Sequence, residues 1–197
     1  PFQWERNTYV RDWPTLRVPA NVADGKYKLK LAVARNDQLL GSALLPFNAT
    51  VVDLGQIEIR NRARLTTVPA VPHSLEATFD NKIRLLGYDA NTDPQQRTMR
   101  VTLYWKALAQ MDTSYTVFVH LLDAKNNVDA SGDAVPGNGE FPTAGWIDGE
   151  YITDGHTLSL ASDLAAGTYQ IEIGMYDPTS GARLKTADGQ DRVILRT

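Results

Sequence analysis

The feature that most constrains this chain is an internal repeat. Aligning Trp4 with Trp146 keeps the register, without a gap, as far as Arg35 on Asp177. The identical pairs in this window are Trp4/Trp146, Tyr9/Tyr151, Asp12/Asp154, Thr15/Thr157, Leu16/Leu158, Ala23/Ala165, Gly25/Gly167 and Tyr27/Tyr169. The apolar and polar positions also stay in phase, which indicates that one supersecondary unit occurs twice.

Both copies of the repeat have the alternation of half-buried strands. In the N-terminal copy the apolar positions are Tyr27, Leu29, Leu31 and Val33, and in the C-terminal copy they are Tyr169, Ile171, Ile173 and Met175. Because successive side chains of a strand point to opposite faces, a period of two predicts a strand with one buried face. Gly25 and the segment 177–181 supply turn signals beside these strands.

The rest of the chain also predicts strands, and no segment has the 3.6-residue apolar stripe of a long helix. In residues 1–60 we expect strands at Thr15–Val18, Tyr27–Ala34, Gln38–Phe47 and Val51–Arg60. Beyond them we expect strands at Ile83–Tyr88, Met99–Leu108, Tyr115–Leu122, Asn127–Val135, Tyr151–Leu160, Thr168–Tyr176, Ala182–Lys185 and Arg192–Arg196. The predicted fold is all-β: an antiparallel two-sheet β-sandwich, Ig-like or jelly-roll-like, with a partial second copy at the N-terminus.

The domain boundary is predicted at a segment that contains proline and has little periodicity. Residues 61–75 carry Val68-Pro-Ala-Val-Pro72 and are expected to form a stiff linker. Residues 1–60 then form the second half of a sandwich unit, and residues 76–197 form a complete sandwich. A half unit leaves an apolar face and strand edges to be covered. We expect it to pack on the C-terminal domain or on a second copy of the chain, as a homo-oligomer.

Composition excludes several functions. A net charge of -3 argues against nucleic-acid binding, which needs a clustered basic surface. No apolar run approaches the roughly 20 residues of a membrane span. With no cysteine, disulfides, thiolate zinc sites and cysteine nucleophiles are excluded. The chain begins with Pro1 and has no signal-peptide pattern, so we interpret it as a fragment of a longer protein.

The histidines and the acidic loop give no metal or catalytic motif. His73 falls in the predicted linker, His120 in a strand and His156 in a predicted turn, with no metal-ligand spacing. For His120 a hydrogen-bonded structural role is favoured over a catalytic base. The loop 89–94 begins like a calcium-binding EF-hand loop but has Pro94 where glycine is needed. We predict an inter-strand turn there, with calcium as the weaker alternative.

Acidic residues gather around the Trp146 loop, at Glu140, Asp148, Glu150 and Asp154. Two carboxylates about 5–10 Å apart are the requirement of glycoside hydrolysis. Nothing in their spacing favours such a pair, and we predict that Glu150 and Asp154 cap turns. No serine stands in a Gly-x-Ser-x-Gly context and no phosphate-binding glycine loop is present. We therefore predict no catalytic residue, no cofactor and no metal site.

Aromatic residues are the candidate ligand-binding positions, because flat rings with polar tips suit sugars. The candidates are Trp13, Tyr104, Trp146, Tyr151 and Tyr176. For Trp146 the alternative is favoured, in which it closes the end of a sheet, since Trp4 recurs at the equivalent place. Trp13 aligns with Gly155, so the repeat does not require an aromatic ring there.

Several motifs resemble a known family. They are Phe-Pro-Thr-Ala-Gly-Trp-Ile-Asp-Gly-Glu at 141–150, Leu-Ala-Ala-Gly-Thr-Tyr at 164–169, Gly-Met-Tyr-Asp-Pro-Thr-Ser-Gly-Ala-Arg-Leu at 174–184, Tyr-Thr-Val-Phe-Val-His-Leu-Leu-Asp at 115–123 and Leu-Tyr-Trp-Lys-Ala at 103–107. The chain resembles the extracytoplasmic β-sandwich regions appended to bacterial membrane glycosyltransferases of the dolichyl-phosphate-mannose-protein mannosyltransferase type. The resemblance covers residues 76–197 and, as a partial copy, 1–60. It implies an extracytoplasmic location, a membrane tether outside this sequence, and transferase chemistry that also lies outside it.

Three functional interpretations remain open at this point. The first is a non-catalytic extracytoplasmic module of a larger membrane-associated protein, for protein or glycan recognition. The second is a fragment of a carbohydrate-active enzyme or a carbohydrate-binding module, which requires an aromatic patch or paired acids. The third is a structural spacer or assembly domain, which requires a large apolar interface.

Overall fold

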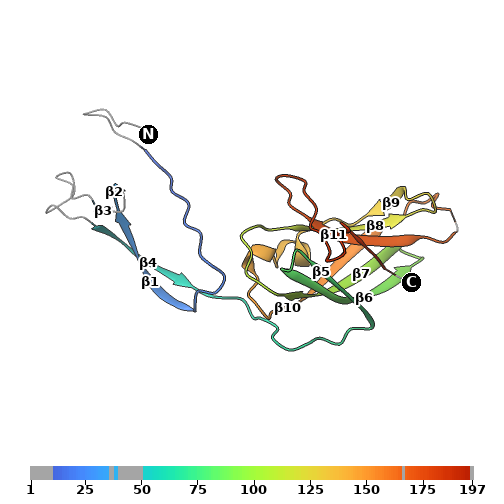
Figure 1. Ribbon diagram of the computed structural model, residues 1–197, viewed down its shortest axis with the longest axis horizontal. Coiled ribbons are helices and arrows are strands. Elements are labelled where there is room, and N and C mark those ends of the chain that lie inside the picture. Colours follow the sequence, from blue (N-terminus) through green and yellow to red (C-terminus); the bar gives the residue numbers. More distant parts are fainter. Residues whose placement is uncertain (1–10, 36–37, 40–50, 166, 196–197) are drawn as a thin grey trace.

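The computed structural model describes residues 11–35, 38–39, 51–165 and 167–195 of the chain. These residues form antiparallel strands joined by loops and two short 3-10 turns, η2 (Pro136–Gly139) and η3 (Thr143–Gly145) (Figure 1). The predicted all-β fold is confirmed.

The C-terminal part is a sandwich of two four-stranded sheets. The first sheet has the order β10-β7-β6-β5, with β5 at His73–Phe79, β6 at Ile83–Asp93, β7 at Thr98–Ala107 and β10 at Tyr151–Ser159. The second has the order β12-β11-β8-β9, with β8 at Thr116–Leu122, β9 at Val128–Ser131, β11 at Gln170–Tyr176 and β12 at Val193–Leu195. Figure 1 shows the two sheets facing each other on the right of the view.

The core lies between these sheets. Leu103 and Trp105 of β7 and Ile171 and Ile173 of β11 are buried in it. Their alternation along each strand is the pattern that the sequence predicts. Removing an apolar side chain of this size from water stabilises the fold by about 1.5–3 kcal/mol. The core is therefore the main source of stability for the sandwich.

The N-terminal part is a hairpin of β1 (Gly25–Ala32) and β4 (Val51–Ile59), beside a short pair of β2 (Ala34–Arg35) and β3 (Gln38–Leu39). The β1–β4 register places Tyr27 opposite Ile57 and Leu31 opposite Val52. Figure 1 shows this hairpin standing away from the sandwich, at the left of the view.

A tyrosine contact recurs in both copies of the repeat. The Tyr27 hydroxyl donates to the Ala23 carbonyl oxygen at 2.9 Å, and the Tyr169 hydroxyl donates to the Ala165 carbonyl oxygen at 2.8 Å. Such a bond, from a tyrosine at the start of a strand back to the preceding turn, is the tyrosine corner of β-sandwiches. The strands that follow are β1 and β11, and each pairs with a later antiparallel strand, β4 and β12. The hairpin is thus a partial second copy of the sandwich.

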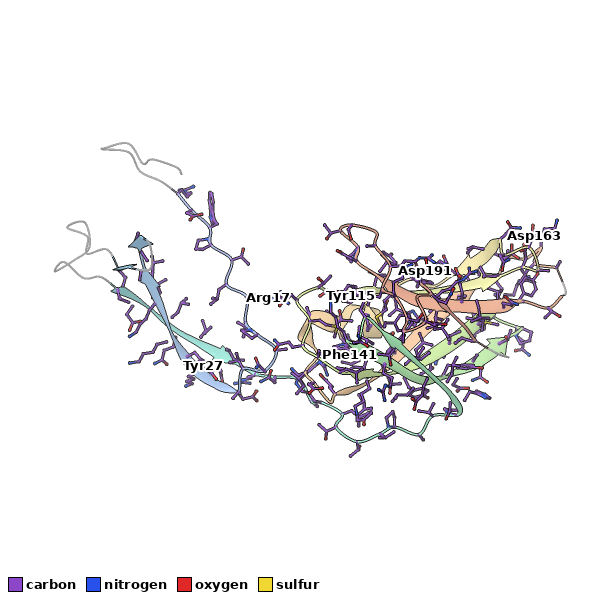
Figure 2. All side chains as sticks on the ribbon, viewed as in Figure 1. Arg17, Tyr27, Tyr115, Phe141, Asp163 and Asp191 are labelled. Atoms are coloured by element: carbon purple, nitrogen blue, oxygen red, sulfur yellow. The ribbon has the colours of Figure 1, made fainter. Side chains whose placement is uncertain are left out.

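Polar contacts attach both flanks of the hairpin to the sandwich. Arg17 donates to the Met111 carbonyl oxygen at 3.4 Å, and the Tyr151 amide donates to the Leu65 carbonyl oxygen at 2.9 Å. Figure 2 shows Arg17 next to the end of the sandwich that carries Tyr115 and Phe141, with Tyr27 on the separate hairpin. These contacts hold the flanking segments on the sandwich, whereas the apolar face of the hairpin, which was expected to be covered, stays uncovered among the described residues.

The structure corrects two strand predictions. Thr15–Val18 is extended but not a strand, since no described residue pairs with it, whereas its counterpart in β10 pairs with β7. The predicted strand Ala182–Lys185 is wrong as well, because only isolated bridges, Tyr176↔Arg183 and Phe79↔Thr186, form there. Of the predicted strand Gln38–Phe47, residues 40–47 lie outside the described residues, as do Trp4 and Tyr9.

Two predicted loops are strands instead. β5 begins at His73, inside the linker predicted at 61–75, because pairing with β6 recruits residues that have weak strand signals of their own. Residues 89–93 of the predicted loop 89–94 belong to β6, whose ladder with β7 extends to Asp93 opposite Thr98. Hairpin hydrogen bonds override the polar composition at both places.

Candidate functional site

A buried polar cluster lies beneath the Trp146 loop, centred on Asp154. This fully buried carboxylate accepts hydrogen bonds from the Trp105 indole N–H at 3.1 Å and from the Gly137 amide at 2.8 Å. His156 Nε2 lies 2.9 Å from Asp154 Oδ2, the oxygen that also accepts from Trp105, and His156 Nδ1 lies 2.7 Å from the Gly132 carbonyl oxygen. The predicted turn at His156 is wrong, because this residue is buried in β10.

Both ring nitrogens of His156 are used for structure. Burial by itself lowers the pKa of His156, but the hydrogen bond and charge of Asp154 outweigh it, so the pKa is raised. A general base needs a free nitrogen lone pair within reach of its substrate. With one nitrogen on Asp154 and the other on Gly132, His156 has none. The cluster ties β10 to β7 and to the 132–137 segment.

Glu150 fastens the linker to the sandwich. Its buried carboxylate accepts a hydrogen bond from Arg64 Nη1 at 2.6 Å and one from the Ile147 amide at 3.1 Å. Arg62 Nη1 lies 2.6 Å from the other carboxylate oxygen, as an ion pair without hydrogen-bond alignment. Arg64 also donates to the Ala20 carbonyl oxygen at 3.0 Å. Glu150 therefore caps a turn, as predicted, and in addition holds both flanks of the hairpin.

The four acids near Trp146 do not face a common cavity. Glu140 and Asp148 are exposed, whereas Glu150 and Asp154 are buried in the separate contacts described above. Glycoside hydrolysis needs two carboxyl groups that both reach the substrate. The described geometry does not provide this arrangement.

A second charged network lies on the outer face of the second sheet. His120 Nδ1 lies 2.9 Å from Glu172, His120 Nε2 lies 3.0 Å from Asp133, and Arg192 donates to Glu172 at 2.7 Å. Burial raises the pKa of Glu172, but the hydrogen bonds from His120 and Arg192 outweigh it, so the net shift is downward. His120 is hydrogen-bonded at both nitrogens, which confirms its predicted structural contacts.

The candidate aromatic residues lie in different places. Trp146 has no exposed surface and its indole N–H donates to the Phe141 carbonyl oxygen at 2.8 Å. It is a core residue, in line with the favoured interpretation, and the alternative that it binds a ligand is wrong. Trp13 is 76% exposed on the segment 11–19, where Arg11 stacks on its ring. Tyr176 lies on the second sheet, beside Phe118.

The structure brings two of these residues together, Tyr104 and Tyr151. Tyr104 pairs with Thr153 and Tyr151 pairs with Lys106, so the two tyrosines are diagonal neighbours on the outer face of the first sheet. Lys106 Nζ lies 5.4 Å from the centre of the Tyr151 ring. Of the candidate aromatic residues, Tyr104 and Tyr151 are thus the two that lie next to each other on one surface.

A polar row continues from Tyr151 across the sheet. Lys106 is opposite Arg84 in β6, and Arg84 is opposite Thr78 in β5. Beyond Thr78 lies an open cleft of about 730 Å³, also lined by Arg192. Arg84 Nε is buried without a hydrogen-bond partner. Arg84 and Lys106 are not among the candidates from the sequence, although their outward positions follow from the alternation within Ile83–Tyr88 and Met99–Leu108.

Comparisons of the chain with protein-family models, with curated proteins and with solved structures find no match. Over the ranges that the structure describes, no helix has both the length and the apolar character needed to cross a membrane. In the same ranges, no group of three or more histidine and carboxylate side chains is placed to hold a metal ion.

Proposed function

We propose that this chain is a non-catalytic extracytoplasmic module of a larger membrane-associated, glycosyltransferase-like protein, and that it recognises a polypeptide partner. The location and the parent protein follow from the resemblance of the motifs given above. The recognition role rests on the N-terminal hairpin.

The absence of a catalytic role is supported by what the buried polar groups contact. Among the described residues, the buried carboxylate and imidazole groups, whose burial and charge suit chemistry, are those of Asp154, Glu150, His156 and Glu172. Each of them is engaged by backbone or side-chain partners that join separate segments of the fold. Groups held in this way act as structural contacts.

The observation that carries the recognition role is the exposure of the hairpin's apolar face. Leu31 is 46% exposed and Val33 is 42% exposed. Their counterparts in the repeat, Ile173 and Met175, have no exposed surface. Large apolar surfaces left in contact with water mark interaction sites. The hairpin thus presents, uncovered, the positions that form the centre of the core in the complete copy.

A site-specific photo-cross-linker tests this proposal. Introduced at position 31 in the producing cell, it is expected to form a discrete adduct with a polypeptide. Introduced at Val128, which is 52% exposed on the sandwich, it serves as the matched control and is expected to give no such adduct. Mass spectrometry of the adduct identifies the partner.

Two results would count against the proposal. Equal labelling from positions 31 and 128 would mean that the hairpin is not a preferred contact. An adduct with a second copy of the chain would instead support the assembly-domain interpretation, in which the exposed face serves the chain's own oligomer.

Glycan binding is a second candidate function, favoured by the surface of Tyr104, Tyr151 and Lys106. A glycan array with the double variant Tyr104→Ala, Tyr151→Ala tests it, because stacking on both rings would be lost. Tyr176→Ala and Trp13→Ala, which alter rings at other places, are the controls. If the double variant still binds glycans, or if binding is lost only in Trp13→Ala, the surface of Tyr104, Tyr151 and Lys106 is not the glycan-binding site.

A further inference from the structure

The strand β1 has one free edge among the described residues. On one side it pairs with β4, and no described strand pairs with the other side. In the complete copy, the equivalent strand β11 pairs with β12 on one side and with β8 on the other. The free edge of β1 is therefore the place that β8 occupies in the sandwich. A row of unpaired backbone N–H and C=O groups there is a template for a further strand.

The side chains along β1 define what fits this edge. Tyr27, Leu29 and Leu31 share one face of the hairpin with Ile57 and Val52 of β4. The other face carries Lys26, Lys28 and Lys30 of β1, and Glu58 and Asp53 of β4 lie opposite Lys26 and Lys30. A strand added in register places its own apolar residues beside the first face and its remaining residues beside the lysines.

The complete copy indicates the charge of the added strand. There, Glu172 of β11 lies opposite the basic residue His120 of β8. Lys30 occupies the position of Glu172 in the repeat, so the sign of the charge is reversed. Opposite charges across a strand pair are stabilising and like charges are destabilising. The residue of an added strand that lies opposite Lys30 is therefore expected to be acidic, as Asp53 is on the β4 side.

We propose that the free edge of β1 binds an extended segment of a partner polypeptide in which apolar and acidic residues alternate. This inference rests on the proposed recognition function and names the chemistry of the partner. Backbone hydrogen bonds extend the sheet, the apolar side chains enlarge the face around Leu29 and Leu31, and the acidic side chains lie beside Lys28 and Lys30. Main-chain bonds provide affinity and the side-chain alternation provides specificity.

The same lysines argue against pairing with a second copy. Antiparallel association of two β1 edges would place Lys26, Lys28 and Lys30 close to the equivalent lysines of the other chain. Repulsion between like charges on adjacent strands disfavours this arrangement. Lysine on an exposed edge also prevents edge-to-edge aggregation of identical chains. An acidic strand from a different polypeptide removes the repulsion.

The experiment uses the full chain and three synthetic peptides about as long as β1. One peptide alternates valine with glutamate, the second alternates valine with lysine, and the third has the composition of the first with its valines grouped together. Binding is measured by titration calorimetry, and its place is measured by amide hydrogen exchange. The glutamate peptide is expected to bind and to slow exchange at alternate β1 residues, those whose N–H groups point away from β4.

A charge-reversal variant tests the sequence preference. In the double variant Lys28→Glu, Lys30→Glu, binding of the glutamate peptide is expected to weaken by about tenfold, from the sum of the cross-strand charge terms. The lysine peptide is expected to gain affinity for the same variant. Lys125→Glu, in an exposed loop of the sandwich, is the control and is expected to change neither peptide's affinity.

Every other outcome overturns the inference. Such outcomes are no binding, equal binding of all three peptides, or binding that does not slow hydrogen exchange in β1. Slowed exchange in β1 that depends only on protein concentration would indicate pairing between two copies of the chain and would also overturn the inference. None of them by itself removes the recognition function, which the cross-link from position 31 tests independently. Failure of both experiments would remove the function as well as its partner.

Discussion

At the scale of the residue, Gly174 shows how one missing side chain shapes a surface. A Cβ atom at Gly174 would lie 2.4 Å from the ring of Phe118 and 3.0 Å from the Asp191 carbonyl oxygen. The Arg183 guanidinium lies over the other part of the same ring, 4.2 Å from its centre. Phe118 is consequently buried on the outer face of the second sheet, outside the main core.

The substitution Gly174→Ala is therefore expected to destabilise the sandwich by about 1–3 kcal/mol, because a buried ring must move. Urea unfolding measures the difference in the free energy of unfolding. Gly155→Ala is the matched control, since a Cβ atom there meets nothing within 4 Å. Similar stabilities for the two variants would contradict this account of Phe118.

The raised pKa of His156 predicts how stability changes with pH. The protonated imidazole is favoured in the folded state, because Asp154 and the Gly132 carbonyl oxygen accept from its two nitrogens. Its contribution is complete below the unfolded pKa of about 6.5 and is lost as pH rises through the higher folded pKa. The free energy of unfolding is thus expected to fall above neutral pH.

Unfolding curves at several pH values, compared with those of His156→Gln, measure this contribution. The difference between the two proteins is expected to shrink as pH rises. A difference that is constant across the range would mean that His156 does not change its protonation state with folding.

At the scale of the element, the tyrosine corner allows the two copies of the repeat to be tested separately. Tyr27 and Tyr169 make the same hydrogen bond, but β1 belongs to the exposed hairpin and β11 to the core. The same local contact is thus placed in two different tertiary environments. The effect of this hydrogen bond on the free energy of global unfolding depends on whether the strand that follows the tyrosine belongs to the hairpin or to the core.

Tyr169→Phe is expected to lower the free energy of unfolding of the sandwich by about 1 kcal/mol, the usual value of one net hydrogen bond. Tyr27→Phe is expected to leave that value unchanged and to speed hydrogen exchange within β1 and β4 only. Thermal unfolding and residue-resolved exchange are the measurements. An equal loss of global stability in both variants would mean that the hairpin and the sandwich unfold as one unit.

At the scale of the whole molecule, Glu150 determines how the linker joins the two parts. Arg62 and Arg64 converge on its carboxylate, and Arg64 also reaches Ala20 on the opposite flank of the hairpin. Both arginines are mostly buried, so trypsin has restricted access to the bonds that follow them. The ion pairs of Glu150 with Arg62 and Arg64 therefore protect the junction between hairpin and sandwich.

Glu150→Gln is expected to speed trypsin cleavage after Arg62 and Arg64 and to lower the free energy of unfolding by about 1–3 kcal/mol. This loss is below that for a fully buried ion pair, because both arginines keep some contact with water. Limited proteolysis and urea unfolding are the measurements. Glu140→Gln, at an exposed acid of the same region, is the control. An unchanged rate of trypsin cleavage in Glu150→Gln would show that the Glu150 ion pairs do not restrain the linker.

Local spacing encodes which candidate residues share a face of a sheet. Tyr104 and Tyr151 share a face because each occupies an outward position of a strand whose alternation is evident. The repeat favours burial of Trp146, since Trp4 stands at the equivalent place, and the Trp146 indole N–H donates to the Phe141 carbonyl oxygen of the same loop. Arg84 and the cleft beside Thr78 depend on the approach of residues 186–194, which lie far away in the chain.

The spacing of neighbouring residues predicts most strands, their apolar faces and the repeat of one strand–turn–strand unit, because these are local properties. Which of the two apolar faces is covered depends on contacts between distant segments. Ile173 is buried because β6 and β7, about 70–90 residues earlier, supply the opposite sheet, whereas Leu31 has no such sheet among the described residues. Local alternation specifies that a face must be covered, and long-range contacts determine by what.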